Sequence, residues 1–579
     1  MRGFAAEKMQ LRGGNVGRVA AVLLMASVSL FIGQTGWASQ RVLVVMKENS
    51  SFRQIDTAYR LSGLRPLSLK SLGLKSLGTT SLAAVNGDVT RSLRGLRALV
   101  MKIDSNADFA RLQNSHEVLF VEREVIHPLP APLRGLKYRP FKSSSSLLEN
   151  PAREISRLVK GTPWGINAVK AKDAWSTARR GEGTRVLILD TGIDKDHPAI
   201  AANLEVGEDF VHDGNLPYPY ADSIGHGTHV AGTIAAVEDV ASGFTGVAPS
   251  AKILAGRVCN ADGCSNISIA EGINWGIEKK VQVISMSLGG LWSTPAERNA
   301  ITLAEESGVS VVAASGNSGI GRVGYPAALP TVIAVGAVDS TLKKADFSQW
   351  GPELDIVAPG VDVISSVPMG SGRESKVEIA IGGEGPSEVL STSFAGAKEL
   401  PAPLNNTLVF AGLGKREDLA QVDVRGKFAL VQRGEIMFSE KAKNALAAGA
   451  LGLLIFNNAP GLIRGALTDD GSTLDIAVAM IEQDPGEKLR DALLNGGVGS
   501  ATLQTLVTNY ASFDGTSMAC PHVSGVVALI RAANPRLTPQ QVRNLVQETA
   551  VTPTESNTNN EYGAGLIDAD AAVKKAVGM

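Results

Sequence analysis

The chain has 579 residues, enough for several domains, and its 56 basic and 57 acidic residues leave a formal net charge of −1. This balance gives no global basic field for nucleic acid and no acidic tail, so no nucleic-acid partner is expected. A hydrophobic content of 44% with 62 glycines is typical of a globular α/β protein and excludes wholesale disorder.

The first 38 residues have the pattern of a secretory signal. Basic residues as far as Arg18 precede an apolar stretch at residues 19–33, and small residues stand at Gly36 and Ala38. This pattern predicts cleavage after Ala38 and removal of residues 1–38. A membrane anchor is the alternative, but the stretch is shorter than the ~20 residues that a spanning helix needs. We therefore expect a secreted protein with no stable membrane anchor after signal cleavage.

Residues 39–127 are predicted to form a small α/β unit. Three apolar runs in it, at residues 41–46, 98–103 and 118–122, are typical of strands. A near-repeat of Leu, Lys, Ser and Gly at residues 67–78 is low in complexity, and we interpret it as an extended loop without chemistry.

The next segment, residues 128–161, has the composition of a linker, with several prolines and a serine run from Ser143 to Ser146. Beyond it, residues 162–369 and 509–579 alternate apolar strands with helical patterns, which indicates βαβ units around a parallel sheet. Ligands bind at the carboxyl ends of the strands in such sheets. Near the C-terminus, Thr538-Pro539 predicts the capped start of an amphipathic helix.

Three short segments far apart in the chain carry candidate catalytic side chains. Asp190 ends the apolar run 186–189, which is typical of a buried parallel strand. His226 and Ser517 each lie close to glycine at the start of an apolar helical pattern. A serine at a helix N-terminus gains from the helix dipole and from free backbone N–H groups. A histidine can take the serine proton, and a buried carboxylate can hold the histidine in the right tautomer.

A fourth segment adds a donor for an oxyanion. Residues 311–317 predict another buried strand, which ends at the polar Asn317. The side-chain amide of Asn317 and the N–H of Ser517 are expected to hold the charge that develops on an attacked carbonyl oxygen. The predicted mechanism is attack by Ser517, with His226 as base and Asp190 as the orienting acid, through an acyl-enzyme.

These segments, in the order Asp, His, Ser, resemble the motifs of subtilisin-like serine peptidases. Further matching stretches are Gly246-Val247-Ala248-Pro249, Met286-Ser287-Leu288-Gly289-Gly290, Gly324-Tyr325-Pro326, 332–338 and Val357-Ala358-Pro359-Gly360. The resemblance implies a secreted serine endopeptidase with a three-layer α/β catalytic domain around a parallel sheet. It also implies an autoprocessed zymogen, in which residues 39–127 form a ferredoxin-like propeptide that inhibits the enzyme and residues 128–161 contain the maturation site.

An insertion at residues 370–508 divides the catalytic domain. Within it, residues 424–434 predict a turn, a strand and a turn, residues 438–448 a helix, and residues 451–457 a strand. This order resembles the protease-associated (PA) domain, a β-rich insertion found in some large subtilases. The resemblance implies that the insertion covers the cleft or binds extended protein substrates, and a passive spacer is the alternative.

Three alternatives compete with an active serine peptidase. Asp190-Thr191-Gly192 alone also resembles an aspartic peptidase loop, but that chemistry needs two such carboxylates and the sequence has one. His226 and His229 have the spacing of metal ligands, but no acidic or cysteine partner stands at metalloprotease spacing. By resemblance, His229 and His522 are packed structural histidines. The third alternative is an inactive binding protein of this fold that acts through its PA domain, and the four polar residues of the site argue against it.

The resemblance also places an extended protein or peptide substrate. The implied substrate-binding residues are Ser287, Leu288, Gly289, Ala314, Gly316 and Gly324. The first three and residues 263–266 are expected to form two backbone edges to which a peptide adds as a strand. The next two should line the pocket for the side chain before the scissile bond, with Gly324 at its floor. Since this floor has neither a side chain nor an acid, we expect a preference for large apolar residues.

Two of the three cysteines, Cys259 and Cys264, bracket a turn-forming stretch, and an exported protein permits a disulfide between them. Two reduced, packed thiols are the alternative. Cys520, one helical turn past Ser517, is expected to be a small buried hydrophobe. The chemistry requires no cofactor. Structural calcium, which many family members bind, is left open because Ala199 stands where relatives with the tight site usually carry an acid.

Overall fold

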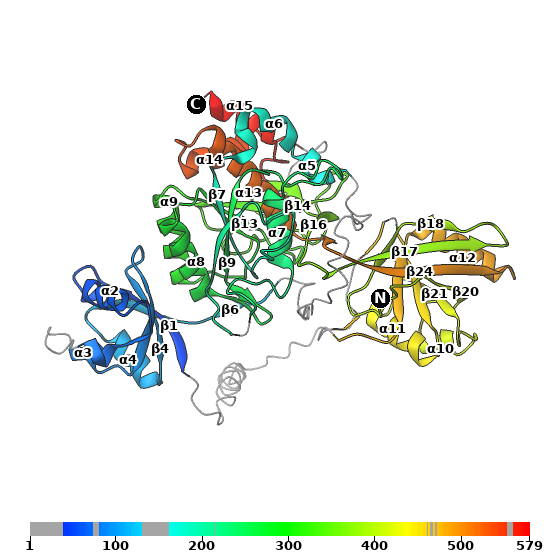
Figure 1. Cartoon of the computed structure of the whole chain (residues 1–579), viewed down its shortest axis with the longest axis horizontal. Coiled ribbons are helices and arrows are strands. Elements are labelled where there is room, and N and C mark those ends of the chain that lie inside the picture. Colours follow the sequence, from blue (N-terminus) through cyan, green and yellow to red (C-terminus); the bar gives the residue numbers. More distant parts are fainter. Residues whose placement is uncertain are drawn as a thin grey trace, which may run out of the picture.

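The computed structural model shows three units: an N-terminal unit, a central unit with a parallel sheet, and an inserted unit (Figure 1). The structure describes residues 39–72, 80–129, 161–214, 216–459, 461–463, 467–468, 472–552 and 560–578. The predicted signal at 1–38 and most of the predicted linker with its maturation site, 130–160, lie outside the described residues. In the part of the chain that is described, no helix has the length and apolar character needed to cross a bilayer.

The central unit is built on a sheet of seven parallel strands in the order β15-β14-β13-β12-β7-β9-β8. These strands are β7 (Arg185–Asp190), β8 (Leu204–Asp209), β9 (Lys252–Arg257), β12 (Val283–Met286), β13 (Ser310–Ala314), β14 (Val332–Val338) and β15 (Ile356–Pro359). Apart from the edge strand β8, they are almost entirely buried runs of Val, Ile, Leu and Ala. That composition is typical of parallel strands covered on both faces.

Helices cover both faces of this sheet. One face packs against α5 (Trp164–Ala168), α6 (Ala171–Ala178), α7 (His226–Ala235), α13 (Thr516–Ala533), α14 (Pro539–Glu548) and α15 (Ala569–Val577). The other face packs against α8 (Asn266–Glu278) and α9 (Pro295–Glu306). Side chains of β7 alternate between the two cores, with Val186 and Ile188 in the first and Leu187 and Leu189 in the second. The predicted three-layer α/β fold is confirmed.

The N-terminal unit has a five-stranded sheet in the order β2-β3-β4-β1-β5. Its elements are β1 (Gln40–Met46), α2 (Phe52–Leu61), β2 (Leu67–Ser68), α3 (Thr80–Ala83), β3 (Gly87–Leu93), β4 (Ala98–Ile103), α4 (Asn106–Gln113) and β5 (Val118–Arg123). Without β2 and α3, the element order and the antiparallel pairing are those of a ferredoxin-like fold, as predicted. Val42 and Val44 face the core of this unit, whereas Leu43 and Val45 join the core beneath α8 and α9.

The first part of the leucine-rich near-repeat, residues 67–72, has regular structure where the sequence predicted an extended loop. Leu67 pairs with Val89, and residues Leu69–Leu72 form a 3₁₀ turn, η1, instead of an extended loop. Leu69 is 1% exposed and lies in the core of the N-terminal unit. The prediction of an extended loop was therefore wrong here, because the gain from burying the leucine outweighs the weak local propensity. Residues 73–79 of the repeat lie outside the described part.

The inserted unit has an eight-stranded mixed sheet in the order β18-β17-β24-β20-β21-β22-β23-β19. Its elements are β17 (Gly372–Ile381), β18 (Ser387–Val389), β19 (Ser391–Ser393), β20 (Leu404–Phe410), α10 (Arg416–Leu419), β21 (Phe428–Gln432), α11 (Phe438–Ala447), β22 (Gly452–Phe456), β23 (Ala477–Ile481), α12 (Gln483–Leu494) and β24 (Gly499–Thr508). The predicted strands and helix within it correspond to β21, β22 and α11. A two-stranded ribbon of β16 (Val363–Ser366) and β25 (Tyr510–Phe513) joins it to the central unit.

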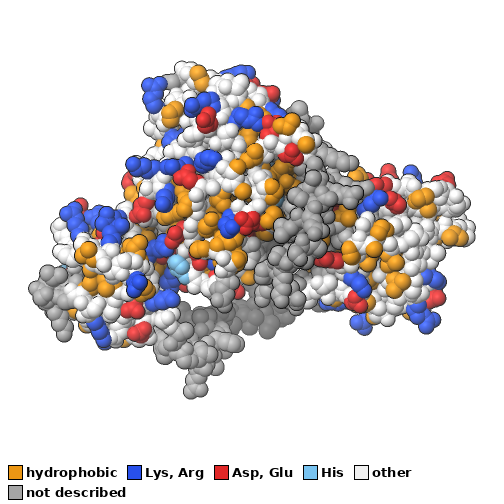
Figure 2. Space-filling view, in the orientation of Figure 1, with side chains coloured by type: hydrophobic (Ala, Val, Ile, Leu, Met, Phe, Trp, Pro, Cys, Tyr) orange, Lys and Arg blue, Asp and Glu red, His pale blue; other side chains and the backbone are white. Residues whose placement is uncertain are grey.

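In Figure 1 the N-terminal and inserted units lie on opposite sides of the central unit. On the face drawn in Figure 2, basic and acidic side chains are interspersed over the three units, as the near-zero net charge leads us to expect. In parallel sheets, ligands bind at the carboxyl ends of the strands. Here the first turns of α7 and α13 carry the candidate residues His226 and Ser517.

Candidate active site

The candidate acid and base meet at the carboxyl edge of the central sheet. Asp190 is the last residue of β7, and His226 is the first residue of α7. The Nδ1 of His226 lies 2.7 Å from Oδ1 of Asp190, and each residue is 2% exposed. The same Oδ1 accepts a hydrogen bond from the N–H of Thr191 at 2.7 Å. A carboxylate that is fixed in this way orients the imidazole and leaves its Nε2 for other partners.

The start of α7 depends on Asp222, a residue that the sequence analysis missed. Its carboxylate accepts hydrogen bonds from the N–H of Gly225 at 2.7 Å, the N–H of Thr228 at 2.9 Å and the hydroxyl of Thr228 at 2.6 Å. It also accepts from the hydroxyl of Thr191, beside Asp190, at 2.9 Å. Asp222 therefore ties the helix that carries His226 to the strand that carries the acid. Asp222 stands three residues before Gly225, the N-cap of α7, so the N-cap pattern in the sequence does not indicate it.

The surroundings of His226 favour its protonated form. Burial lowers the pKa of the imidazole, but the charge of Asp190 and the hydrogen bond to it outweigh burial and hold the pKa of His226 above its ordinary value. The Nε2 is buried and has no hydrogen-bond partner among the described residues. Buried polar atoms without partners are uncommon in folded proteins. This nitrogen is therefore available to exchange a proton with a group in the cleft.

Ser517 lies in the first turn of α13. Its hydroxyl donates to the carbonyl oxygen of Ser287 at 3.1 Å, and the hydroxyl of Ser287 donates to the carbonyl oxygen of Ser517 at 2.8 Å. The structure thus joins acid and base by a hydrogen bond, but it turns the serine hydroxyl toward Ser287 instead of His226. A rotation of the serine about χ1 redirects this hydroxyl. Catalytic hydrogen bonds of this kind often align only when substrate is bound.

Asn317 follows β13 and lies beside the start of α13. Its Oδ1 accepts hydrogen bonds from the N–H of Thr516 at 2.9 Å and from the hydroxyl of Thr516 at 2.8 Å. These bonds commit the oxygen of the amide and leave its Nδ2 as a donor. The N–H of Ser517, in the first turn of α13, lies too early in the helix to have an acceptor four residues before it. A side-chain amide donor from Asn317 and a backbone N–H donor from Ser517 therefore both lie beside Gly515 at the start of α13.

The glycines named for the pocket lie together. A Cβ at Gly324 would lie 3.1 Å from the carbonyl oxygen of Ser315, so this position has little room for a side chain. Gln349, which the sequence analysis missed, packs against Gly316, where a Cβ would overlap its Oε1. Both amide atoms of Gln349 bond to backbone groups, the Nε2 at 2.6 Å and the Oε1 at 3.3 Å. A neutral amide that is already hydrogen-bonded therefore lies beside these glycines.

A short strand of the N-terminal unit occupies one of the two backbone edges named for substrate. This edge is β11 (Gly263–Ser265), which pairs with β10 (Cys259–Asn260), and a disulfide joins Cys259 to Cys264 across the pair. Strand β6 (Ile126–His127) of the N-terminal unit adds to the other side of β11, antiparallel. The opposite edge is formed by residues 287–290, with Leu288 4% exposed. An extended chain is therefore already bound where a peptide was expected.

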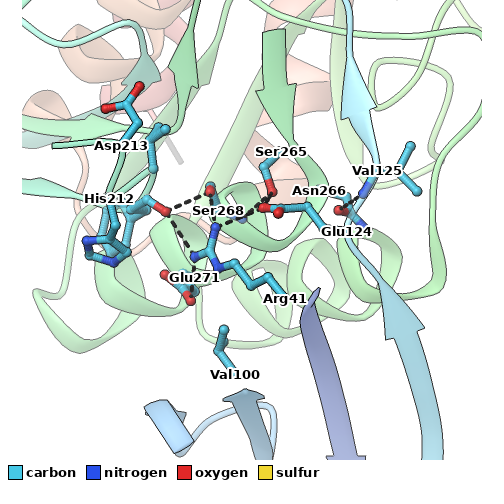
Figure 3. Close-up of polar contacts among 12 residues, drawn as sticks. Arg41, Val100, Glu124, Val125, His212, Asp213, Ser265, Asn266, Ser268 and Glu271 are labelled. Atoms are coloured by element: carbon cyan, nitrogen blue, oxygen red, sulfur yellow. Dashed lines mark hydrogen bonds and ion pairs between the residues drawn. The ribbon is translucent and has the colours of Figure 1, made fainter. Parts of the chain in front are cut away.

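Arg41 of β1 fastens the N-terminal unit to the central unit (Figure 3). Its guanidinium donates at 2.9 Å to Glu271 of α8, to Glu124 and to the hydroxyl of Ser268. Nearby, a carboxylate oxygen of Glu122 accepts from the N–H of Ala296 at the start of α9, at 2.9 Å. A carboxylate at a helix N-terminus is favoured by the helix dipole. The N-terminal unit thus binds α8 and α9 through charged contacts as well as through one face of its sheet.

Other titratable groups near the site have structural roles. His229 stacks on Phe513, with ring centroids 4.4 Å apart, and burial lowers the pKa of His229 to about 3. Burial also lowers the pKa of His522 to about 4 and raises the pKa of the Cys520 thiol to about 11. All three therefore stay neutral in their apolar surroundings near pH 7. In the described ranges, no three His, Cys, Asp or Glu side chains gather to hold a metal ion, so we assign no calcium ligands.

The fold and this site define a serine endopeptidase, and comparison with known proteins identifies its family. The model of the Subtilase family matches residues 181–398 and 469–565, more than half of the chain, and the model of the PA domain matches residues 397–489. The chain belongs to the subtilase family and contains a PA domain.

Relatives and a solved structure agree with this assignment. M-protease of Shouchella clausii (strain KSM-K16) is 39% identical over 282 residues, which are 46% of this chain and 70% of the relative. Subtilisin E of Bacillus subtilis (strain 168) is 42% identical over 218 residues, 37% of this chain and 56% of the relative. The crystal structure of the psychrophilic subtilisin-like protease Apa1 from the Antarctic psychrotroph Pseudoalteromonas sp. AS-11 has a TM-score of 0.54 at 30% identity. That match covers 72% of this chain and 99% of Apa1.

Proposed function

We propose that Asp190, His226 and Ser517 form the catalytic triad of this endopeptidase, and that the chain is made as a secreted zymogen that cleaves itself. One observation carries the triad. The imidazole of His226 is fixed through Nδ1 on Asp190, while its buried Nε2 has no partner among the described residues. A base that is oriented on one side and unsatisfied on the other is what activation of a serine hydroxyl requires.

The proposed mechanism follows from these positions. The hydroxyl of Ser517 leaves the Ser287 carbonyl, gives its proton to Nε2 of His226 and attacks the carbonyl carbon of a peptide bond. Asp190 stabilises the imidazolium that forms, and the Asn317 amide and the Ser517 N–H hold the oxyanion. The imidazolium then protonates the leaving amine, and an acyl-enzyme remains on Ser517. Water releases this acyl group by the same steps in reverse, so the chemistry uses side chains and backbone of this chain alone.

The side-chain preference of the pocket before the scissile bond is also a proposal. Gln349 packs against Gly316, and its side-chain amide is neutral and already hydrogen-bonded, so no charged group lies beside these glycines to attract Lys or Arg. We infer a preference for large apolar residues over Lys and Arg at this position. Comparison of kcat/KM for peptides with Phe, Leu or Arg there tests it, and faster cleavage after Arg would refute it.

The position of the N-terminal unit supports the zymogen. Strand β6 occupies the β11 edge of the cleft, so the unit acts as an intramolecular inhibitor until it is released. The first 38 residues support secretion through their signal pattern. Structural calcium stays a prediction, and so does the role of the inserted unit, which either covers the cleft, binds extended protein substrates or acts as a passive spacer.

Incubation of the purified full-length precursor tests the triad and the self-cleavage together. The wild-type chain should shed its N-terminal unit, with a new N-terminus between residues 128 and 161, whereas Ser517→Ala should stay full length. Ser524→Ala is the matched control, because it removes another buried hydroxyl of α13, one that bonds to Ser285 at 2.8 Å, without touching the proposed triad. Ser524→Ala should mature and react with a fluorophosphonate probe. A Ser517→Ala chain that still matures by itself would disprove the assignment.

A further inference from the structure

Strand β6 of the N-terminal unit ends at His127. The side chain of His127 occupies a well-defined site on the central unit, which we call the seat. His127 is 5% exposed and lies opposite Cys264 of β11. Its Nε2 is 2.9 Å from Oε1 of Glu297, a residue of α9 that is 4% exposed. Since a glutamate carboxylate only accepts, the Nε2 of His127 is the donor in this hydrogen bond.

Two further residues complete the seat. The ring of His127 packs edge-on against the indole of Trp292, with centroids 5.4 Å apart and an interplanar angle of 63°. On another side lies Gly290, where a Cβ would stand 2.7 Å from Nδ1 of the ring. The seat is therefore an acid, an aromatic wall and a glycine that leaves room for a flat ring. All three belong to the central unit, so they remain when the N-terminal unit is released.

Glu297 is held in place independently of its occupant. Its Oε2 accepts hydrogen bonds from the N–H of Thr294 at 2.7 Å and the hydroxyl of Ser293 at 3.2 Å. With the side chain of Thr294 bonded back to the N–H of Glu297, these contacts form the capping box of α9. One carboxylate oxygen therefore stabilises the start of the helix, and the other is bound to His127.

The distance along the cleft assigns this seat to a substrate position. Ser287 contacts the nucleophile, since its carbonyl oxygen lies 3.1 Å from the hydroxyl of Ser517. Gly290, which borders the seat, is three residues further along the same edge. At ~3.3 Å per residue these points are ~10 Å apart, which a bound strand spans with three residues. The seat thus receives the fourth residue before the scissile bond.

We propose that this seat is a substrate subsite that selects histidine as the fourth residue before the scissile bond, with Glu297 as the specificity-determining residue. The inference rests on the proposed function of the cleft. A leucine or phenylalanine there would leave Oε1 of Glu297 buried without a donor, whereas histidine supplies the donor and fits between Gly290 and Trp292. A lysine supplies a donor but not the flat ring that packs on Trp292. His127 therefore occupies the cleft as a mimic of substrate.

The test measures kcat/KM of the matured wild-type enzyme on four peptides that differ only at this position, which carries His, Leu, Phe or Lys. The His peptide should be cleaved at least about tenfold faster than each of the other three. Glu297→Gln should lower the ratio of His to Leu severalfold while the fold is retained. The chain itself shows that glutamine can build such a capping box, because Gln541 has that place in α14.

A second variant tests the shape of the seat. Gly290→Ala fills the space beside the ring, so it should slow cleavage of the His and Phe peptides while a peptide with Ala at this position is little affected. Equal rates on the four peptides, faster cleavage of the Lys peptide than of the His peptide, or an unchanged His-to-Leu ratio in Glu297→Gln would overturn the inference and leave the endopeptidase assignment intact. Absence of cleavage of every peptide by the matured wild type would instead contradict the proposed function.

Discussion

Replacement of Asp222 by alanine should weaken both the fold and the catalytic step, because this carboxylate fastens the start of α7. Its oxygens accept five hydrogen bonds, three from backbone N–H groups and two from threonine hydroxyls. Each of the three N–H groups left without an acceptor costs ~1–3 kcal/mol. Because the hydroxyls can rotate to other acceptors, we expect a loss of about 3 kcal/mol in the free energy of unfolding.

The same change should lower kcat, since His226 is the first residue of the helix that Asp222 caps. A displacement of the base by a fraction of an ångström to ~1 Å reduces turnover on the order of 10- to 100-fold. Thr538→Ala is the matched control. It removes the side-chain cap of α14 and should cost ~1 kcal/mol with kcat unchanged.

Stability is best measured by urea unfolding in the inactive Ser517→Ala background, where unfolded chains are not digested, and kcat by peptide hydrolysis in the active background. Turnover at the wild-type rate in Asp222→Ala would refute the role of this cap in positioning the base. An equal loss of kcat in Thr538→Ala would show that general destabilisation, not the position of His226, limits the reaction.

Three further outcomes are expected. Asp190→Asn removes the charge that raises the pKa of His226. The acidic limb of the kcat/KM profile rises as the imidazole loses its proton, so this limb should move to lower pH and kcat should fall. A limb that does not move would contradict the assigned pair of Asp190 and His226. The pKa values of about 3 for His229 and about 4 for His522 lie below the ~6.5 of a histidine in the unfolded chain. The unfolded chain therefore takes up protons first as the pH falls below 6.5, and the free energy of unfolding should fall by about 2 kcal/mol per histidine between pH 6.5 and 5. Urea midpoints of the inactive precursor at both pH values check this, and a chain with His522→Gln should lose less; an identical loss would count against it. Serine at both positions of the Cys259–Cys264 bridge should cost ~2 kcal/mol of stability. Because β11 loses this crosslink, KM should rise more for extended peptides than for short ones. Equal changes in KM would argue against a role for the β11 edge in substrate binding.

The candidate catalytic side chains could be predicted because each has a local signal. Asp190 ends an apolar strand, and His226 and Ser517 start apolar helices, so that parallel-sheet topology brings them to one edge. The three-layer fold could be predicted for the same reason, from strands that are apolar on both faces. These signals depend on neighbouring residues in the chain, so they can be detected in a single sequence.

The residues that the sequence analysis missed act through contacts that only the fold creates. Gln349 reaches the pocket from a loop after β14, and His127 meets Glu297 although 170 positions separate them in the chain. The rotamer of Ser517 depends on the carbonyl of Ser287, which no local pattern indicates. Leu69 was assigned to a loop because its composition is repetitive, yet the neighbouring sheet offers it a place in a core.

The place of the inserted unit in the chain also sets the order in which the enzyme can assemble. Helix α13 packs against β12, β13, β14 and β15, but it follows the whole insertion in the sequence. During synthesis, the proposed acid and base emerge first, and the part of their sheet that α13, α14 and α15 cover stays exposed while the insertion is translated and folds. The N-terminal unit is made before either and packs against α8 and α9, which cover the opposite face of the sheet. A ribosome thus delivers the proposed inhibitor first and the proposed nucleophile last, so a partly made chain lacks the complete triad that we propose.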